Sequence, residues 1–167
     1  QTTAIKPWSP TDPQLYTLMT ELLNSAGLTV DQYEQRIGFR RVEVSGQKLL
    51  LNGQEVSLRG FGMHEDFPIL GKTNNAALRV KDFELLRWLN ANSFRTSHYA
   101  YAEETLDEAD RRGFLVISEV ASVNLDFRRI DETTLGRHQD LVTRQMARDG
   151  SHACVIAWSL TNEPGYL

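Results

Sequence analysis

Short apolar segments that alternate with helical patterns constrain the fold of residues 47–167 more than any other feature. Four short segments are predicted strands, and two of them, residues 114–117 and 153–158, are continuously apolar. The three segments between the strands carry apolar residues spaced three to four apart. The predicted strands end near Gly62, Thr96, Ile117 and Trp158, and the predicted helices cover 75–90, 103–112 and 134–148. Continuously apolar strands are typical of parallel sheets covered on both faces, so we expect an α/β fold.

Two architectures fit this alternation of strands and helices. An open doubly wound sheet usually carries a Gly-rich phosphate loop after its first strand, and no predicted strand here is followed by one. The alternative is an eight-stranded (β/α)8 barrel, the TIM barrel, which takes about 250 residues. We therefore predict that residues 47–167 form the first half of a TIM barrel.

Residues 1–46 have an all-β pattern instead. Residues 15–23 and 28–36 can pair as strands around a turn at 24–27, and Val42 and Val44 suggest a third short strand. Three short strands cannot form an independent core. The sequence therefore predicts two domains: residues 1–46 as the C-terminal strands of a β-sandwich, and residues 47–167 as part of a barrel.

Composition excludes several classes of partner. The formal charge of −4 and the pI near 5.6 leave no basic surface, so no nucleic acid is expected to bind. No apolar stretch approaches the length that crosses a bilayer, so no membrane partner is expected either. The single cysteine, Cys154, excludes an internal disulfide framework and is predicted to be a core residue. None of these features assigns a compartment.

Each predicted strand is followed within a few residues by a histidine or a carboxylate. His64 and Glu65 follow the first strand, His98 the second, Glu119 the third and Glu163 the fourth. The carboxyl ends of parallel barrel strands meet on one face, where barrel enzymes place their active sites. We therefore expect these four strand ends to share one site.

Four motifs in this order resemble glycoside hydrolase family 2, and among its members most closely the β-glucuronidases. They are Arg36-Ile37-Gly38-Phe39-Arg40, Gly60-Phe61-Gly62-Met63-His64-Glu65-Asp66, Asn90-Ala91-Asn92-Ser93-Phe94-Arg95-Thr96-Ser97-His98-Tyr99 and Trp158-Ser159-Leu160-Thr161-Asn162-Glu163-Pro164. The resemblance runs over nearly the whole chain. It implies an immunoglobulin-like β-sandwich followed by a catalytic TIM barrel, and hydrolysis of β-glucuronides without a cofactor. A carbohydrate substrate of the glucuronide type and a homo-oligomeric parent protein are expected from it.

The resemblance also assigns roles to individual residues. Glu163 would be the general acid/base, Asn162 would hydrogen-bond the 2-hydroxyl of the sugar, and His64 and His98 would line the sugar pocket. Retaining glycosidases hold a second carboxylate about 5 Å from the acid, as the nucleophile. We expect that glutamate to lie beyond residue 167, so the 167 residues alone are expected to be inactive.

Glu65, Asp66 and Glu119 are the carboxylates within the chain that could stand in for the second catalytic carboxylate, and Glu119 is closest to Glu163 by topology. We expect Glu119 to act in substrate binding or as a structural hydrogen-bonding group instead. Ala100 and Ser118 stand where the family usually has a proline and an aspartate. These departures leave open a catalytically dead carbohydrate-binding homologue. A family 2 β-galactosidase or β-mannosidase is a separate alternative to the β-glucuronidase.

The histidines also have simpler interpretations. His64 and His98 could satisfy backbone groups at the strand ends, and His138 and His152 are expected to be surface or packing residues without a constellation. No two histidines have the close spacing on one helix that is typical of a zinc site, so no metal site is predicted.

Overall fold

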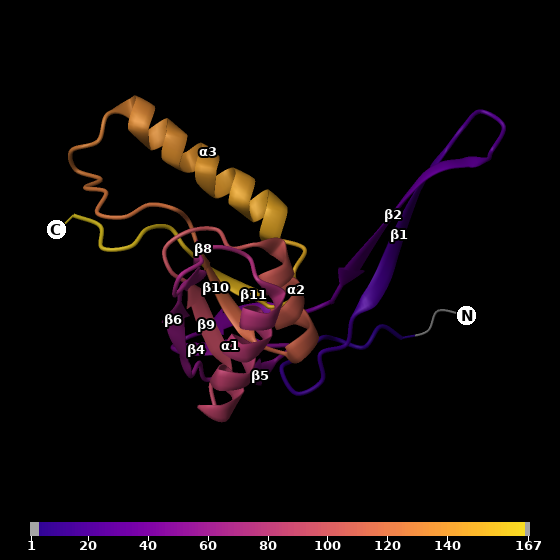
Figure 1. The fold of residues 1–167 in the computed structure, drawn as a ribbon, viewed down its shortest axis with the longest axis horizontal. Coiled ribbons are helices and arrows are strands. Elements are labelled where there is room, and N and C mark those ends of the chain that lie inside the picture. The colour runs from indigo at the N-terminus through magenta and orange to yellow at the C-terminus, as the bar shows by residue number, and fades with distance from the viewer. Residues whose placement is uncertain (1–3, 166–167) are drawn as a thin grey trace.

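A parallel four-stranded sheet with three helices forms the body of the protein in this computed structural model, which describes residues 4–165 (Figure 1). The sheet has the strand order β11-β10-β9-β6. Its strands are β6 (Gly60–Met63), β9 (Ser93–Thr96), β10 (Leu115–Glu119) and β11 (Val155–Ser159). The connecting helices are α1 (Ala76–Trp88), α2 (Glu103–Arg112) and α3 (Glu132–Asp149). The predicted parallel α/β arrangement is confirmed.

The remaining strands form three small antiparallel sheets. They are β1 (Tyr16–Leu23) with β2 (Thr29–Ile37), then β3 (Val42–Ser45), β4 (Lys48–Leu51) and β5 (Gln54–Glu55), and finally β7 (Asp66–Phe67) with β8 (Gly71–Lys72). The β1–β2 hairpin projects away from the body (Figure 1). Because β3 pairs with β4, one small sheet spans residue 46, where the sequence predicts a boundary.

Local sequence signals account for the helix ends. The Asn75 side chain accepts hydrogen bonds from the first turn of α1, and the Asp131 carboxylate accepts one from the first turn of α3. Gly113 ends α2 in the left-handed conformation with φ of 78°, which a residue without a Cβ adopts at little cost.

The apolar core lies between the sheet and helices α1 and α2. Phe83 of α1 packs edge-on against Phe94 and Phe114, with ring centroids 5.7 and 5.3 Å apart. The predicted leucine stripe of α1 (Leu78, Leu85, Leu86 and Leu89) is only partly inward-facing: Leu86 is buried, but Leu85 and Leu89 are 45% and 52% exposed. Phe83, which lies off that stripe, sets the packing face instead.

Helix α3 differs from its prediction in the same way. Its apolar stripe of Leu135, Val142 and Met146 is not buried, and the buried residues of the helix are Gln145 and Asp149. These polar side chains hydrogen-bond to the end of β10, which explains their burial. Across residues 4–165, no helix combines the length and apolar character needed to cross a bilayer.

The N-terminal segment closes the sheet at the amino ends of its strands. Trp8 is fully buried, and its indole N–H donates to the Asp110 carbonyl at 2.8 Å. Arg40 likewise donates to the Val155 carbonyl at the start of β11. The opposite edge, at the carboxyl ends, is therefore the one left free for a site.

Candidate active site

The four predicted strand ends lie side by side at one edge of the sheet. Strands β6, β9, β10 and β11 are parallel neighbours in register, so their carboxyl ends point the same way. His64 directly follows β6, His98 lies two residues after β9, Glu119 ends β10, and Asn162 lies three residues after β11. The topology thus gathers the residues that the sequence singles out.

A continuous series of contacts joins these strand ends. The rings of His64 and His98 meet edge to face with centroids 5.4 Å apart. His98 Nδ1 lies 2.6 Å from Oε1 of Glu119. Glu119 Oε2 lies 3.3 Å from Nε of Arg95, whose Nη2 is 3.5 Å from Oδ1 of Asn162. Histidine, carboxylate, guanidinium and amide groups therefore form one polar cluster.

Backbone hydrogen bonds fix the position of Asn162, whereas the side chain of Glu163 is exposed. The Asn162 N–H donates to the Ser122 carbonyl at 2.8 Å, and its carbonyl accepts from the Asn124 N–H at 3.0 Å. Glu163 has a left-handed backbone with φ of 47°, which residues with a Cβ rarely adopt outside turns and functional sites. Its side chain is exposed and makes no hydrogen bond to residues 4–165. The carboxylate is therefore available to a ligand.

Glu119 differs from Glu163 in being fully buried. Its carboxylate also accepts from the Ser159 hydroxyl at 2.7 Å, and its backbone N–H donates to the Thr96 hydroxyl at 2.8 Å. Enclosure by protein donors favours the structural hydrogen-bonding role over direct contact with a substrate.

Glu65 lies next to His64 in the sequence but serves helix α2. Residue 102, at the start of α2, is an alanine and supplies no side-chain cap. The Glu65 carboxylate replaces that cap: it accepts from the Ala102 N–H at 3.2 Å and from the Thr105 hydroxyl at 2.6 Å. A negative charge at a helix N-terminus is also favoured by the helix dipole.

Two tyrosines join the loops after β6 and β9. The Tyr99 hydroxyl accepts from the Glu65 N–H at 2.9 Å, and Lys72 lies over its ring. Tyr101 is buried, and its hydroxyl donates to carbonyl oxygens of Met63 and Ser97. Burial raises the pKa of both phenols, so they remain neutral donors and acceptors.

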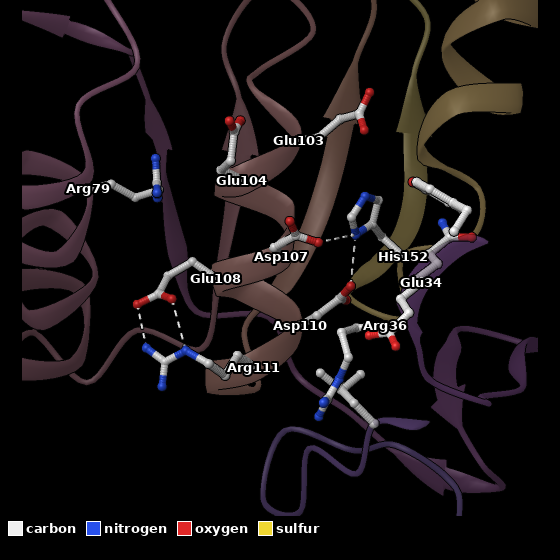
Figure 2. Close-up of a pocket in the computed structure, with 13 residues that line it drawn as sticks. Glu34, Arg36, Arg79, Glu103, Glu104, Asp107, Glu108, Asp110, Arg111 and His152 are labelled. Carbon is white, nitrogen blue, oxygen red and sulfur yellow. Dashed lines mark hydrogen bonds and ion pairs between the residues drawn. The ribbon is translucent and has the colours of Figure 1, made fainter. Parts of the chain in front are cut away.

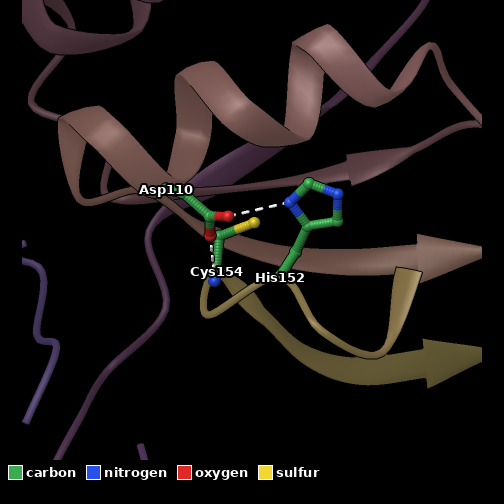
Figure 3. A group of neighbouring side chains, drawn as sticks. All are labelled: Asp110, His152 and Cys154. Carbon is green, nitrogen blue, oxygen red and sulfur yellow. Dashed lines mark hydrogen bonds and ion pairs between the residues drawn. The ribbon is translucent and has the colours of Figure 1, made fainter. Parts of the chain in front are cut away.

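A second buried cluster lies at the opposite ends of the strands. Asp110, His152 and Cys154 face one another there (Figure 3). His152 Nδ1 lies 2.8 Å from Oδ2 of Asp110, whose Oδ1 accepts from the Cys154 N–H at 2.6 Å. The expectation that His152 has no constellation is wrong. Cys154 is a core residue as predicted, and burial raises the pKa of its thiol.

The ligand atoms of this second cluster lie within 4.8 Å of one another. Each group nevertheless has a hydrogen-bonding partner in the protein, including the thiol, which lies 3.6 Å from the Leu106 carbonyl. A complete hydrogen-bond network of this kind is stable without an ion. We therefore interpret the cluster as a structural connection between α2 and β11.

Two cavities flank the sheet. One of about 610 Å³ lies along α2 and β2, and its charged lining includes Asp107, Glu108 and His152 (Figure 2). It opens beside the second cluster, away from the strand ends that carry the site. The other, of about 430 Å³, is lined by His64, Asp66 and apolar residues of β6 and α1. Of these two cavities, the smaller one reaches a predicted site residue.

Sequence reasoning missed the roles of Arg95 and Ser159. Arg95 lies inside a predicted strand and Ser159 directly after one, and both contact Glu119. A charged residue inside a short buried strand was the available signal for Arg95, because such a charge needs a partner. Ser159 carried no comparable signal, since a hydroxyl at a strand end is common.

Two family models match the chain. One described as "Glycosyl hydrolases family 2, TIM barrel domain" matches residues 42–167, and one described as "Glycosyl hydrolases family 2" matches residues 1–40. Similar curated proteins are named β-glucuronidases. The chain is 47% identical to one from Paenibacillus borealis, with 93% of this chain and 28% of that protein covered. It is 41% identical to the human protein, with 90% and 24% covered.

The solved structures that this chain resembles are also β-glucuronidases. A β-glucuronidase from Bifidobacterium dentium, complexed with coumarin-3-O-glucuronide, superposes with a TM-score of 0.90 at 42% identity, covering 96% of this chain and 26% of that one. One from Ruminococcus gnavus, in complex with D-glucuronic acid, gives 0.87 at 42% identity, covering 97% and 28%. The chain thus spans about a quarter of the length of the relatives it matches.

Proposed function

Because the chain belongs to glycoside hydrolase family 2, we propose that the protein carrying it is a retaining β-glucuronidase that releases glucuronate from β-D-glucuronides. The observation that carries this proposal is the exposed Glu163 carboxylate, placed after Asn162 at the end of a parallel strand. The similarity to β-glucuronidases over nine-tenths of the chain supports the choice of sugar.

The proposed mechanism uses two carboxylates. Glu163 protonates the glycosidic oxygen as the bond breaks and later removes a proton from water. A nucleophilic glutamate about 5 Å away attacks the anomeric carbon; we place it in a part of the protein outside this chain. No step needs a cofactor.

Three further residues would bind the sugar. Asn162 would hydrogen-bond the 2-hydroxyl, and its fixed backbone supports a defined position for that amide. His64 and His98 would line the pocket, and their edge-to-face contact supports a shared wall. Hydrogen bonds to the 2-hydroxyl strengthen as the transition state forms, so Asn162 would contribute to rate as well as to binding.

We also propose the finer architecture. The four parallel strands in sequence order, joined by α1, α2 and α3, would be the first half of a TIM barrel. Residues 1–46 would be the end of an immunoglobulin-like sandwich, which the β1–β2 hairpin supports. A homo-oligomeric parent protein is a further prediction, which light scattering of the whole protein would test.

Hydrolysis of a panel of p-nitrophenyl β-D-glycosides by the whole protein tests the proposal. We expect the glucuronide to be hydrolysed with the highest kcat/KM, and proton NMR to show the β-anomer of glucuronate as the first product. Preference for the galactoside or mannoside would assign another family 2 activity. Binding of glucuronate without turnover of any glycoside would instead indicate the catalytically dead homologue that Ala100 and Ser118 leave open.

A further inference from the structure

Glu119 is the point at which three strand ends meet. Its buried carboxylate is hydrogen-bonded to His98 after β9 and accepts from Ser159 at the end of β11, and it forms an ion pair with Arg95 within β9. These three partners divide unequally between its oxygens. Oε1 faces only His98 Nδ1, at 2.6 Å, whereas Oε2 faces Ser159 Oγ at 2.7 Å and Arg95 Nε at 3.3 Å.

This arrangement determines which ring nitrogen of His98 carries a proton. A carboxylate with donors on both oxygens is an acceptor only, so the hydrogen bond to Oε1 requires a proton on Nδ1. The hydrogen bond made by one ring nitrogen of a neutral histidine sets the state of the other. Neutral His98 must therefore present an unprotonated Nε2.

The remaining ring edge of His98 is accessible. Its side chain keeps 27% of its surface exposed, while the Glu119 side chain is fully enclosed. The exposed part of the ring therefore lies away from the carboxylate. His64 packs against the same ring edge to face, so His98 is restrained from two sides.

We propose that Glu119 is a positioning residue: it holds His98 in the Nδ1–H tautomer, so that Nε2 accepts a hydrogen bond from a hydroxyl of the bound sugar. The sugar part of this proposal rests on the proposed function, whereas the tautomer does not. Through Ser159, the same carboxylate also fixes the end of the strand that leads to Asn162. A side chain that only filled space at this position would set neither the tautomer of His98 nor the position of the end of β11.

The Glu119→Gln variant should change the tautomer of His98. A glutamine has one acceptor oxygen and one NH2 group. Keeping the oxygen on Ser159 retains the acceptor of that hydroxyl and keeps the NH2 group away from the Arg95 guanidinium, which places the NH2 group against His98 Nδ1. That nitrogen must then be the acceptor, so the variant should reverse the His98 tautomer to Nε2–H.

Nitrogen-15 NMR of the histidine-labelled whole protein tests this, with the His98 signals identified by their loss in His98→Ala. We expect the Nδ1–H form of neutral His98 in the unchanged protein and the Nε2–H form in Glu119→Gln. Ser159→Ala keeps the carboxylate and should leave the tautomer as it is. Asp110→Asn changes the other buried carboxylate–histidine pair, so it should alter His152 signals and leave those of His98 unchanged. An Nε2–H form of His98 in the unchanged protein would overturn the proposal.

Kinetics of the whole protein test the link to the sugar. In metal sites, loss of a carboxylate that orients a ligating histidine typically costs about 10–100-fold in affinity or activity, and we take the same range for this carboxylate–histidine pair. We expect Glu119→Gln to lower kcat/KM by about that factor, and the double variant with His98→Ala to be no slower than His98→Ala alone. Additive effects would contradict action through His98. Absence of glycosidase activity in the unchanged protein, with the Nδ1–H tautomer present, would overturn the proposed function and leave the positioning of His98 standing.

Discussion

His152 Nδ1 lies 2.8 Å from Oδ2 of Asp110, and this pair connects the last turn of α2 to the segment before β11. Glu119 and His98 form a second carboxylate–histidine pair, at the carboxyl ends of the strands. One buried carboxylate–histidine pair thus lies at each end of the sheet. The pair at the candidate site leaves its histidine partly exposed, whereas the Asp110 pair is enclosed.

The Asp110–His152 pair predicts a pH dependence of stability. Burial alone would lower the pKa of His152, but the hydrogen bond to Asp110 and the charges of Asp110, Asp107 and Asp149 outweigh burial and raise it. The folded state therefore binds the proton more tightly than the unfolded state does. This stabilisation is complete below the unfolded pKa of about 6.5 and is lost as pH rises through the folded value.

Thermal unfolding of the chain from about pH 5 to about pH 9 measures this effect. We expect His152→Asn to lower the melting temperature most at the acidic end, so that the difference from the unchanged chain shrinks with pH. His138→Asn is the matched control, because His138 is only partly buried and packs against Phe127. A difference in melting temperature between His152→Asn and the unchanged chain that does not vary with pH would contradict a raised pKa of His152.

The close approach of β6 to β9 leaves no room for a Cβ at Gly60. A Cβ at this position would lie 1.9 Å from the Ser93 carbonyl oxygen, and that backbone is fixed in the parallel ladder with β9. We expect Gly60→Ala to reduce the free energy of unfolding by about 1–3 kcal/mol. Urea denaturation measures the change.

Gly136 is the matched control for that substitution. It lies within α3, where an added Cβ would meet no atom within 4 Å. Alanine is a better helix former than glycine, so Gly136→Ala should stabilise the chain by about 0.5–1 kcal/mol. Equal effects of the two substitutions would show that the close approach of β6 to β9 is wrong.

The cap that Glu65 supplies to α2 predicts a loss of stability. Glu65→Ala leaves the Ala102 N–H and the Thr105 hydroxyl without their acceptor, which should cost about 1–2 kcal/mol in urea denaturation. Glu104→Ala removes an exposed acid from the first turn of the same helix and should cost no more than about 0.5 kcal/mol. A larger loss for Glu104→Ala than for Glu65→Ala would contradict the cap.

The sequence predicted the elements of the parallel sheet to within a few residues, because strand and helix periodicity are local signals. Strand β9 was predicted at residues 93–96, where the structure has it, and α2 was predicted at 103–112. The gathering of His64, His98 and Asn162 at one edge followed from the parallel topology alone. Motif order then identified the family.

Long-range contacts could not be predicted in this way. Trp8 closes the sheet against Asp110, 102 residues further along the chain, and no local pattern signals that contact. Glu119 and Glu65 are both carboxylates that follow predicted strands, yet one contacts site residues and the other caps a helix. Which partner a polar group finds depends on packing between distant segments, so these roles emerge only in three dimensions.

The Glu163→Gln variant of the whole protein tests the central claim most directly. General acid catalysis contributes about 10²–10⁴-fold, so hydrolysis of an alkyl β-D-glucuronide, whose leaving group needs protonation, should fall by at least about 10²-fold. Aryl glucuronides with acidic phenols should lose much less in the bond-breaking step, and Glu103→Gln on the exposed face of α2 should change neither. Unchanged turnover of the alkyl glucuronide by Glu163→Gln would contradict the assignment of Glu163 as the acid/base.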